Sequence, residues 1–455
     1  MASLREKLTA NIDAIEIVLK LNGEKPTPEQ QQALKRYAGF GDLKCILFDP
    51  ARPQEFSQSE QHLIPSVQRL HDVVRENAPA HFNDYINSLK ESVLTSFYTP
   101  NEIIASLDRV FSKNRVTFQN VLDPSAGLGA FTTIKGGKYT LIEKDQLTGF
   151  ILKALYPDNK VISAGFETIP ANQNGTYNLV TSNIPFGNFK VYDAGYYNSK
   201  DPVLRQSVNT VHTYFFEKGM DMLRNGGILA FITSTGVMDS PGNEPYRQHL
   251  LSRAKLITAV RLPENLFGST KAQSDLIILQ RDDRRTANTL LSPDEEKFIR
   301  VEDIRGDGVY LNSYYNQQQT RHTVATENRI DTDMYGKPDV RFVHSGGVPG
   351  IAKDMYTIIN ADLRRNIERK LFNAYNLPVV IPAGRPVQLS LFDDFNNYQK
   401  REEQKPTTFE YTNDIYRQDG SYQLSGNEIG KAIDSKTAEI IIEQDETKRQ
   451  LIIDY

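Results

Sequence analysis

The sequence has 455 residues, of which 39% are hydrophobic and 24% are charged, and its net charge is −4. This composition is typical of a globular protein with room for two or three domains, and it excludes fibrous and disordered chains. Cys45 is the single cysteine, no paired Cys or His spacing predicts a zinc site, and no apolar run is long enough to span a membrane. We expect a cytoplasmic protein with no metal site, in which any contact with nucleic acid depends on a local patch.

Residues 1–90 are predicted to form a helical region. Apolar residues recur at helical spacing over 4–19 and again over 63–74. Between them, the segment YAGFGDLK (37–44) has glycines suited to a turn. This turn either ends a helix or contacts a ligand, and the sequence leaves both readings open.

Residues 91–283 are predicted to hold a Rossmann-like α/β sheet of seven strands. Short apolar runs alternate with helical stretches, which is typical of a mostly parallel sheet covered on both faces. The last two runs are too close together for a crossover helix, so we expect the final strand to be antiparallel. The predicted strands are 120–123, 139–143, 161–163, 177–183, 228–234, 256–262 and 275–280.

Residues 284–455 are predicted to be a smaller C-terminal region of α/β structure and linkers. The chain becomes more polar here, and 395–408 lacks periodicity, which is typical of a linker. The last segment, 436–455, has the pattern of a helix.

A ligand site is predicted where the first strand of the sheet ends. Asp123 closes that strand, and Gly127 and Gly129 form a tight turn in which the backbone can approach a ligand. Glu143 closes the next strand, in the position from which a carboxylate accepts ribose hydroxyls, with Asp145 as its rival. Because the sequence has no phosphate-binding glycine motif, a nucleoside without phosphates fits best, and S-adenosylmethionine is such a ligand.

Five segments occur in the order found in a known family of enzymes. They are TSFYTP (95–100), DPSAGLGAF (123–131), IEKD (142–145), GFE (165–167) and SNIPFG (182–187). In this order the chain resembles the gamma class of N6-adenine DNA methyltransferases. With YAGFGDLK, AVRLPENLF and SDLIILQ, it more narrowly resembles the methylase region of large methylase and helicase proteins of bacterial mobile elements. The resemblance implies the class I methyltransferase fold.

The resemblance also implies which residues hold S-adenosylmethionine. The FYT segment would meet its methionine part, the glycine turn would cradle it, Glu143 would hold its ribose, and GFE would flank its adenine. Many relatives have Asp where this sequence has Gly165, so this sequence departs from the family at the usual contact to the cofactor's amino group. The implied cofactor residues are Phe97, Tyr98, Thr99, Asp123, Pro124, Ala126, Gly127, Gly129, Glu143, Phe166 and Glu167.

Catalysis is predicted at Asn183, Ile184, Pro185 and Phe186. An adenine amine is a poor nucleophile, because its lone pair is delocalised into the ring, so a catalyst must accept both amine hydrogens. The resemblance assigns one acceptor to the Asn183 side chain and the other to the carbonyl of Ile184, which replaces the first proline of the usual motif. Pro185 keeps Ile184 extended, and Phe186 offers a face for a base turned out of the duplex. The competing reading is a strand-ending turn with a core Phe.

The C-terminal region is the predicted place for DNA recognition or partner binding. Arginines accompany Tyr310, Tyr314 and Tyr315, although interspersed acidic residues equally favour a solvated surface. A second feature, QLSLF, resembles the peptide by which bacterial proteins bind the replication sliding clamp, or is a strand of the protein's own core. The predicted clamp-binding residues are Gln388, Leu389, Ser390, Leu391 and Phe392.

The leading hypothesis is a DNA adenine-N6 methyltransferase that serves modification or anti-restriction of a mobile element. The second is methylation of protein glutamine or RNA adenine, because related motifs occur in those enzymes. The third is a catalytically silent DNA-docking module of a larger assembly. Since no helicase motifs are present, the chain is expected to be part of a longer or split methylase and helicase system. The sequence does not reveal the DNA recognition sequence.

Overall fold

The computed structural model describes residues 3–375, with gaps at 22, 42, 96–97, 268–271, 317–321, 333–335 and 337, and four short C-terminal strands. The chain forms two units, Met1–Pro378 and Val379–Tyr455. The predicted domain boundaries at residues 90 and 283 both lie inside the first unit and stay predictions. Within the described residues, no helix is long and apolar enough to cross a membrane.

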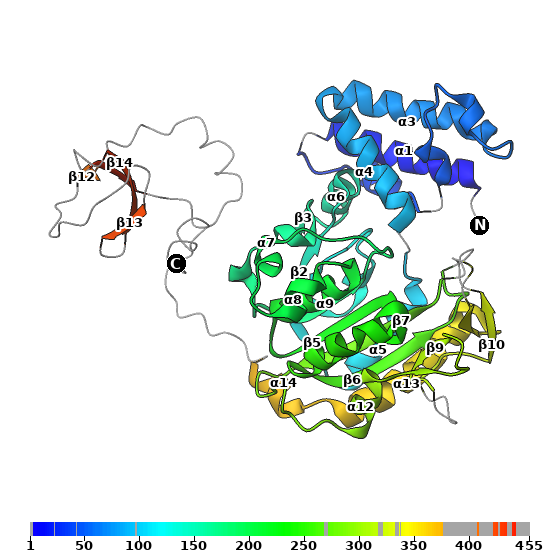
Figure 1. The fold of residues 1–455 in the computed structure, drawn as a ribbon. Helices are drawn as coiled ribbons and strands as arrows, with labels where there is room; N and C mark the ends of the chain where they lie inside the picture. Colours follow the sequence, from blue (N-terminus) through cyan, green and yellow to red (C-terminus); the bar gives the residue numbers. More distant parts are fainter. Residues whose placement is uncertain are drawn as a thin grey trace. The chain divides into compact units, whose positions relative to one another are not determined.

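A seven-stranded sheet lies at the centre of the first unit (Figure 1), in the order β3-β2-β1-β4-β5-β7-β6. The first five strands run parallel, and β7 pairs antiparallel with both β5 and β6. All seven predicted strands, the antiparallel final strand and the class I methyltransferase fold are therefore confirmed. The strands are β1 (Phe118–Asp123), β2 (Gly136–Ile142), β3 (Lys160–Ile162), β4 (Tyr177–Asn183), β5 (Leu223–Ser234), β6 (Ala254–Leu262) and β7 (Ser274–Arg281).

Helices cover both faces of the sheet, which explains why its strands are apolar on both sides. In β5, Leu229 and Phe231 face the core beneath α9 and α11, while Ile228 and Ile232 face the core beneath α5 and α13. The helices beyond residue 100 are α5 (Asn101–Lys113), α6 (Gln146–Leu155), α7 (Ala194–Tyr197), α8 (Pro202–Ser207), α9 (Val211–Met222), α10 (Gly236–Asp239), α11 (Glu244–Leu251), α12 (Pro293–Ile299), α13 (Gly347–Asn366) and α14 (Arg369–Tyr375).

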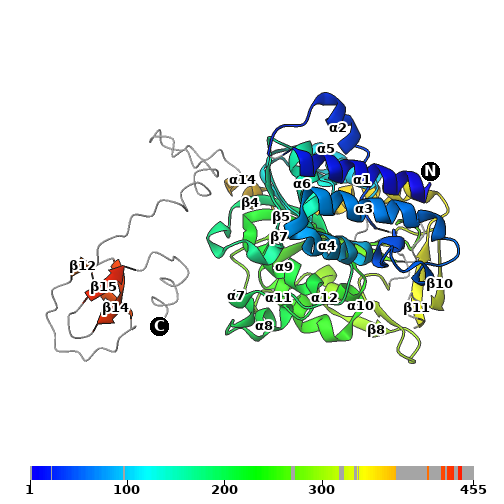
Figure 2. The same ribbon diagram turned by 90° about the horizontal axis from the view of Figure 1, so that it is seen from above.

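The N-terminal helices pack against the sheet domain through α6. Figure 2 shows α1 and α3 side by side, and both occupy the segments whose periodicity predicts helices. Leu8 and Ile12 of α1 share one core with Leu147 and Ile151 of α6. The N-terminal region is thus anchored beside the turn that follows β2. Its helices are α1 (Leu4–Lys20), α2 (Pro28–Leu34), α3 (Ile64–Asn77) and α4 (Phe82–Thr95).

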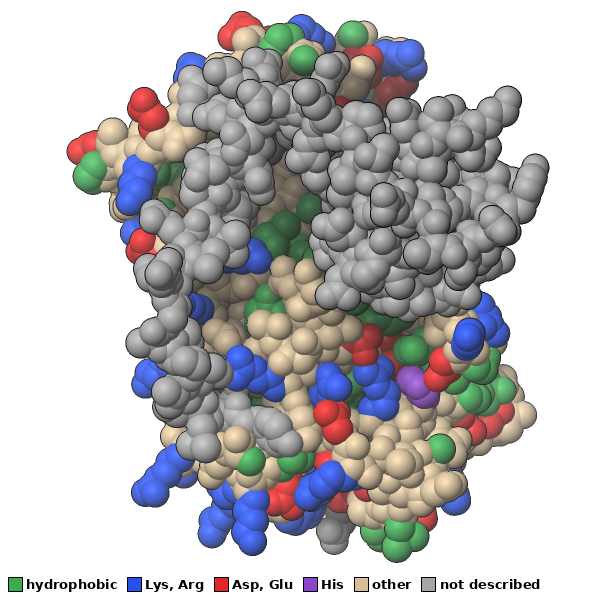
Figure 3. Space-filling view, turned by 90° about the vertical axis from the view of Figure 1, so that its left-hand side faces the viewer, with side chains coloured by type: hydrophobic (Ala, Val, Ile, Leu, Met, Phe, Trp, Pro, Cys, Tyr) green, Lys and Arg blue, Asp and Glu red, His purple; other side chains and the backbone are tan. Residues whose placement is uncertain are grey.

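Small antiparallel sheets complete the described residues: β8 (Val301–Asp303) with β9 (Tyr310–Asn312), and β10 (Glu327–Thr332) with β11 (Pro338–Val343). The second unit has a sheet in the order β12-β15-β14-β13, formed by Thr407–Thr408, Glu439–Ile442, Glu428–Asp434 and Tyr422–Ser425. Figure 3 shows one face of the molecule, over which Lys and Arg side chains of the described residues are spread.

The predicted C-terminal helix is wrong at β15. Three successive isoleucines there favour a strand, which pairs antiparallel with β14. The predicted linker lies outside the described residues except for β12.

Candidate active site

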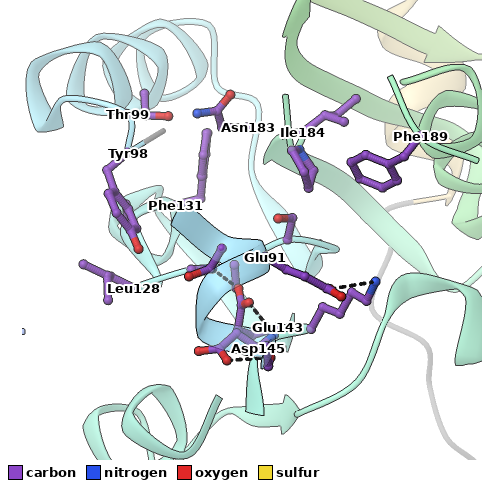
Figure 4. Close-up of a pocket in the computed structure, with 18 residues that line it drawn as sticks. Glu91, Tyr98, Thr99, Leu128, Phe131, Glu143, Asp145, Asn183, Ile184 and Phe189 are labelled. Carbon is purple, nitrogen blue, oxygen red and sulfur yellow. Dashed lines mark hydrogen bonds and ion pairs between the residues drawn. The ribbon is translucent and has the colours of Figure 1, made fainter. Parts of the chain in front are cut away.

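A cavity of about 460 Å³ lies at the carboxyl ends of β1, β2 and β4 (Figure 4). The chain order reverses between β1 and β4, and open α/β sheets bind ligands at such a point. Its volume is in the range of small-molecule sites. It is lined by Ser88, Glu91, Ser92, Tyr98, Thr99, Ser125, Ala126, Gly127, Leu128, Ala130, Phe131, Glu143, Lys144, Asp145, Asn183, Ile184, Pro185 and Phe189.

The two glycines of the turn after β1 serve different purposes. Both have positive φ, +52° at Gly127 and +74° at Gly129, before a 3₁₀ helix at Ala130–Thr133. Gly127 lines the cavity, and a Cβ there would lie 3.3 Å from Tyr98 Cε1. A Cβ on Gly129 would instead lie 2.6 Å from Tyr156 Cε2, away from the lining. Gly127 therefore shapes the cavity wall, and Gly129 allows the turn to pack on α6.

Glu143, which is half-buried, and Asp145, which is buried, form a pair of carboxylates at one end of the cavity (Figure 4). Glu143 accepts hydrogen bonds from the backbone N–H of Gly127 at 2.8 Å and of Asp145 at 2.9 Å. Burial, and then the neighbouring charge of Asp145, raise the pKa of Glu143 to about 7. Asp145 caps α6 through the N–H of Thr148, and burial also raises its pKa. Of the two rivals, Glu143 is the one tied to the glycine turn.

Asp123 lies beneath the turn and does not line the cavity. It is fully buried, and it accepts hydrogen bonds from Ser182 Oγ at 2.7 Å and from the N–H of Ser125 at 3.2 Å. Burial raises the pKa of Asp123 to about 7. This carboxyl joins β1 to β4 and supports the turn from below. Pro124 is also buried outside the lining.

β4 delivers Asn183, Ile184 and Pro185 to the cavity wall. The N–H of Ile184 donates to the carbonyl of Ile232 in β5 at 2.9 Å, which fixes the backbone just beyond the strand. Phe186 does not line the cavity, because its ring packs edge-on against Phe267, with 5.7 Å between ring centroids, and also contacts His212.

The FYT segment reaches the cavity at the opposite side from Phe189 (Figure 4). Tyr98 and Thr99 line the cavity, whereas Phe97 is outside the described residues. Thr99 Oγ1 is buried and has no hydrogen-bond partner among the described residues.

The N-terminal glycine segment packs against Tyr98. A Cβ on Gly39, which has φ of +68°, would lie 1.7 Å from the Tyr98 hydroxyl. Buried Asn11 fixes this segment by donating to the Gly39 carbonyl at 2.7 Å and accepting from the N–H of Ala38 at 2.8 Å. The segment does not line the cavity itself, and its link to the site passes through Tyr98.

The GFE segment does not reach the cavity. The Phe166 ring is buried against Tyr214 and Phe215, with ring centroids 6.2 and 5.2 Å away. A Cβ on Gly165 would lie 2.1 Å from Glu167 Oε1, so this glycine leaves room for that carboxylate. The predicted role of Phe166 and Glu167 toward a cofactor's adenine stays a prediction.

Residues 85–267 match the Eco57I restriction-modification methylase family. The chain is 25% identical over 196 residues to the defense against restriction protein B of Escherichia phage P1, covering 41% of this chain and 8% of that protein. The matched part of the chain thus spans a small fraction of this relative's length. The predicted resemblance to a restriction-modification methylase is confirmed for this part of the chain.

Two solved structures also align with the chain. The modification subunit of a type I restriction enzyme from Vibrio vulnificus is 17% identical to this chain, with a TM-score of 0.36. The alignment covers 49% of this chain and 53% of that chain. A type I restriction-modification methyltransferase subunit from Streptococcus thermophilus is 15% identical to this chain, with the same TM-score. The alignment covers 60% of this chain and 65% of that chain.

Helix α4 supplies residues of the cavity that the sequence does not single out. Ser88, Glu91 and Ser92 share one face of α4, and Lys144 contacts Glu91 with 3.9 Å between Nζ and Oε2. Ser88 Oγ donates to Asp145 Oδ1 at 2.7 Å. The spacing of three and four residues marks a common helix face, but nothing in the sequence tells that this polar face meets a cavity.

Two of the three tyrosines and two of the arginines considered for DNA recognition serve the fold of the first unit. Tyr314 and Tyr315 are only 1% and 2% exposed, so neither is available for stacking on a base. Arg281 donates to backbone carbonyls after α9, and Arg285 pairs with Glu295 at 3.0 Å. Arg321 lies outside the described residues.

Proposed function

We propose that the methylase region transfers a methyl group from S-adenosylmethionine to the N6 amine of adenine in DNA. The observation that carries this proposal is that Asn183, the last residue of β4, lines the same cavity as the glycine turn after β1 and Glu143 after β2. An amide acceptor next to a nucleoside-sized cavity suits methylation of an amine. The family match to a restriction-modification methylase and the phage relative named for defence against restriction support DNA as the substrate.

Three features of the cavity fit S-adenosylmethionine, which supplies an electrophilic methyl group when bound. Gly127 leaves a wall without a side chain, and Thr99 Oγ1 is a buried polar atom without a partner among the described residues. Glu143 uses one acceptor position of each oxygen for the backbone, so a second position on each is left for a ribose hydroxyl. Tyr98 and Thr99 would hold the methionine part.

The chain's part in the reaction is to accept the two amine hydrogens. The side-chain oxygen of Asn183 accepts one and the carbonyl of Ile184 accepts the other, which draws the nitrogen toward tetrahedral geometry and concentrates its lone pair. Both acceptors also face the positive charge that develops on this nitrogen. No strong base is required at this stage, because the extra proton leaves after the transfer.

The backbone at residue 184 suits a fixed acceptor even though Ile replaces proline there. Pro185 restricts Ile184 to extended conformations, and the hydrogen bond from Ile184 N–H to β5 holds the peptide in place. Because the side chain of Ile184 is fully buried in the core, its carbonyl is positioned by packing as well.

The class of methyl acceptor tests this proposal. The protein is incubated with S-adenosylmethionine labelled in the methyl group and separately with DNA, RNA and protein, and digested products are separated by chromatography. We expect label in N6-methyladenine from DNA. Label in protein glutamine or RNA adenine would support the second hypothesis, and absence of both transfer and cofactor binding would support a silent docking module.

We further propose that the chain acts within a larger system, because its match covers 8% of the phage protein. The role would be modification or anti-restriction of a mobile element. Binding of the sliding clamp through Gln388–Phe392 belongs to this proposal, and these residues lie outside the described part of the structure.

A further inference from the structure

The segment that follows the catalytic turn, 188–200, displays aromatic side chains that the fold does not use. Tyr192 is 78% exposed, Tyr197 is 57% exposed and Phe189 is 38% exposed. The Tyr192 and Tyr197 rings lie near each other, with centroids 6.2 Å apart. Exposed rings of this size are uncommon on a solvated surface and mark binding sites when they gather.

Neighbouring tyrosines in the same segment show that this exposure is selective. Tyr196, in α7, turns inward: its ring packs on Tyr214 with centroids 5.3 Å apart, and its hydroxyl donates to Asp221. Val191 also packs against the core. The segment is therefore anchored by Val191 and Tyr196, while Tyr192 and Tyr197 project away from that anchor.

The charges of the segment are divided in the same way. Asp193 pairs with buried Lys218 at 2.8 Å, and Asp201 caps α8 through the N–H of Val203 at 2.7 Å. Lys190 and Lys200 are exposed, and within the described part of the chain neither forms an ion pair. The acidic groups are thus used by the fold, and the cations are left to solvent.

This surface is continuous with the cavity through Phe189. Figure 4 shows Phe189 beside Ile184, at the side of the cavity facing away from Tyr98. Phe186, the aromatic residue of the catalytic segment itself, packs against Phe267 instead. An aromatic ring at the mouth of the cavity, followed by two more rings and two free cations, matches what a single strand of nucleic acid needs: faces for stacking and charge along the backbone.

We propose that Phe189, Lys190, Tyr192, Tyr197 and Lys200 form a track for the DNA strand that carries the target adenine, with Phe189 as the stacking face for the base that enters the cavity. This inference rests on the proposed function, since it takes DNA as the substrate. It assigns to Phe189 the stacking role that the sequence motif assigns to Phe186.

The test measures binding of a fluorescein-labelled 20-nucleotide oligodeoxythymidine by anisotropy. We expect Phe189→Ala and Tyr192→Ala each to weaken binding about tenfold, because stacking on one ring is lost. Lys190→Ala should reduce the slope of log affinity against log salt by about 0.7, the value for one phosphate contact on a single strand. Matched controls are Leu4→Ala and Lys353→Ala, which remove an exposed apolar side chain and an exposed cation elsewhere and should leave binding unchanged.

Three outcomes would overturn the track: no binding by the wild type, equal losses in the Tyr192→Ala and Leu4→Ala variants, or much tighter binding of an oligouridine of the same length. Methyl transfer to DNA, measured on the same proteins, separates the two proposals. Transfer without any effect of the track variants on oligonucleotide affinity would leave the proposed function standing and reject the track. Track-dependent binding of the oligonucleotide without methyl transfer would support the track and reject the proposed function.

Discussion

The two ends of the cavity differ in how far the protein has already satisfied its polar groups. At the end formed by Glu143 and Asp145, both carboxylates accept backbone hydrogen bonds, Asp145 is buried and Glu143 is half-buried, and the turn holding them is packed on α6. At the end formed by Asn183 to Phe189, the wall opens to solvent and Phe189 is 38% exposed. We call the first the closed end, because its carboxylates already accept hydrogen bonds within the fold, and the second the open end, because it faces the surface.

This difference fits the order in which the two ligands of a methylase would be used. A small cofactor gains affinity from a preorganised site, because little has to be ordered when it binds. A macromolecular substrate needs an open approach, and its target base arrives from outside. Substitutions at the two ends should therefore have separable effects, on turnover at one end and on cofactor affinity at the other.

The largest effect is expected at the open end. Asn183→Ala removes an acceptor that acts mainly in the transition state, so turnover should fall by about 10²-fold or more while cofactor affinity is kept. Steady-state and single-turnover methyl transfer to DNA measure this. If Asn183→Ala transfers methyl groups as fast as the wild type, turnover does not depend on the open end of the cavity.

At the closed end, Gly39→Ala should weaken S-adenosylmethionine binding by about tenfold, because a Cβ at this position overlaps the Tyr98 hydroxyl and displaces a cavity wall. Gly23→Ala is a matched control, since Gly23 also has positive φ but has nothing within 4 Å of its Cβ position. Both variants carry the same backbone strain. Calorimetric titration that finds equal affinities in the two would show that Tyr98 is not held by Gly39.

The raised pKa of the Glu143 carboxyl predicts that the stability of the fold depends on pH. Its pKa is raised from 4.5 to about 7 in the folded protein, so folding takes up a proton between these values. The free energy of unfolding should fall as pH rises through this range, by about 3 kcal/mol from this group, and level off above pH 7.

Urea denaturation of wild type and Glu143→Gln between pH 4.5 and 8 isolates this contribution, since Asp123 and Asp145 remain in both proteins. The fall in stability with pH should be shallower in Glu143→Gln. Parallel curves would mean that Glu143 keeps its ordinary pKa in the fold.

The smallest effect is expected for the clamp peptide. A synthetic peptide of residues 384–397 should bind bacterial sliding clamp weakly, because a short peptide must be ordered on binding. Replacing both Leu391 and Phe392 with Ala should abolish binding without unfolding the protein. A sharp drop in melting temperature of the full chain carrying both replacements would show instead that these side chains belong to its core.

The sheet and the positions of its strand ends could be predicted from the sequence, because continuous apolar runs and glycine turns report local structure directly. Asn183 and Glu143 were placed at the right edge for this reason. The inward packing of Phe166 could not be predicted, since it depends on Phe215 and other rings distant in sequence. For Phe186, the packing against Phe267 agrees with the competing reading of a core Phe.

The contact of the N-terminal region with the cavity wall could not be predicted from the sequence for a similar reason. Nothing in YAGFGDLK reveals that Gly39 packs on Tyr98, because that contact depends on how α1 and α6 share a core. The helix predicted over 436–455 is wrong for a related reason: the run at Glu439–Ile442 fits a helical period, but its strand pairing with β14 decides the structure.

The most direct test of the account is calorimetric titration of S-adenosylmethionine into wild type, Glu143→Ala and Asn183→Ala. We expect the wild type and Asn183→Ala to bind S-adenosylmethionine with the same affinity. We expect Glu143→Ala to bind it far more weakly, because the ribose acceptor and the support of the Gly127 turn are both lost. Equal affinity in wild type and Glu143→Ala, or no binding by the wild type, would contradict it.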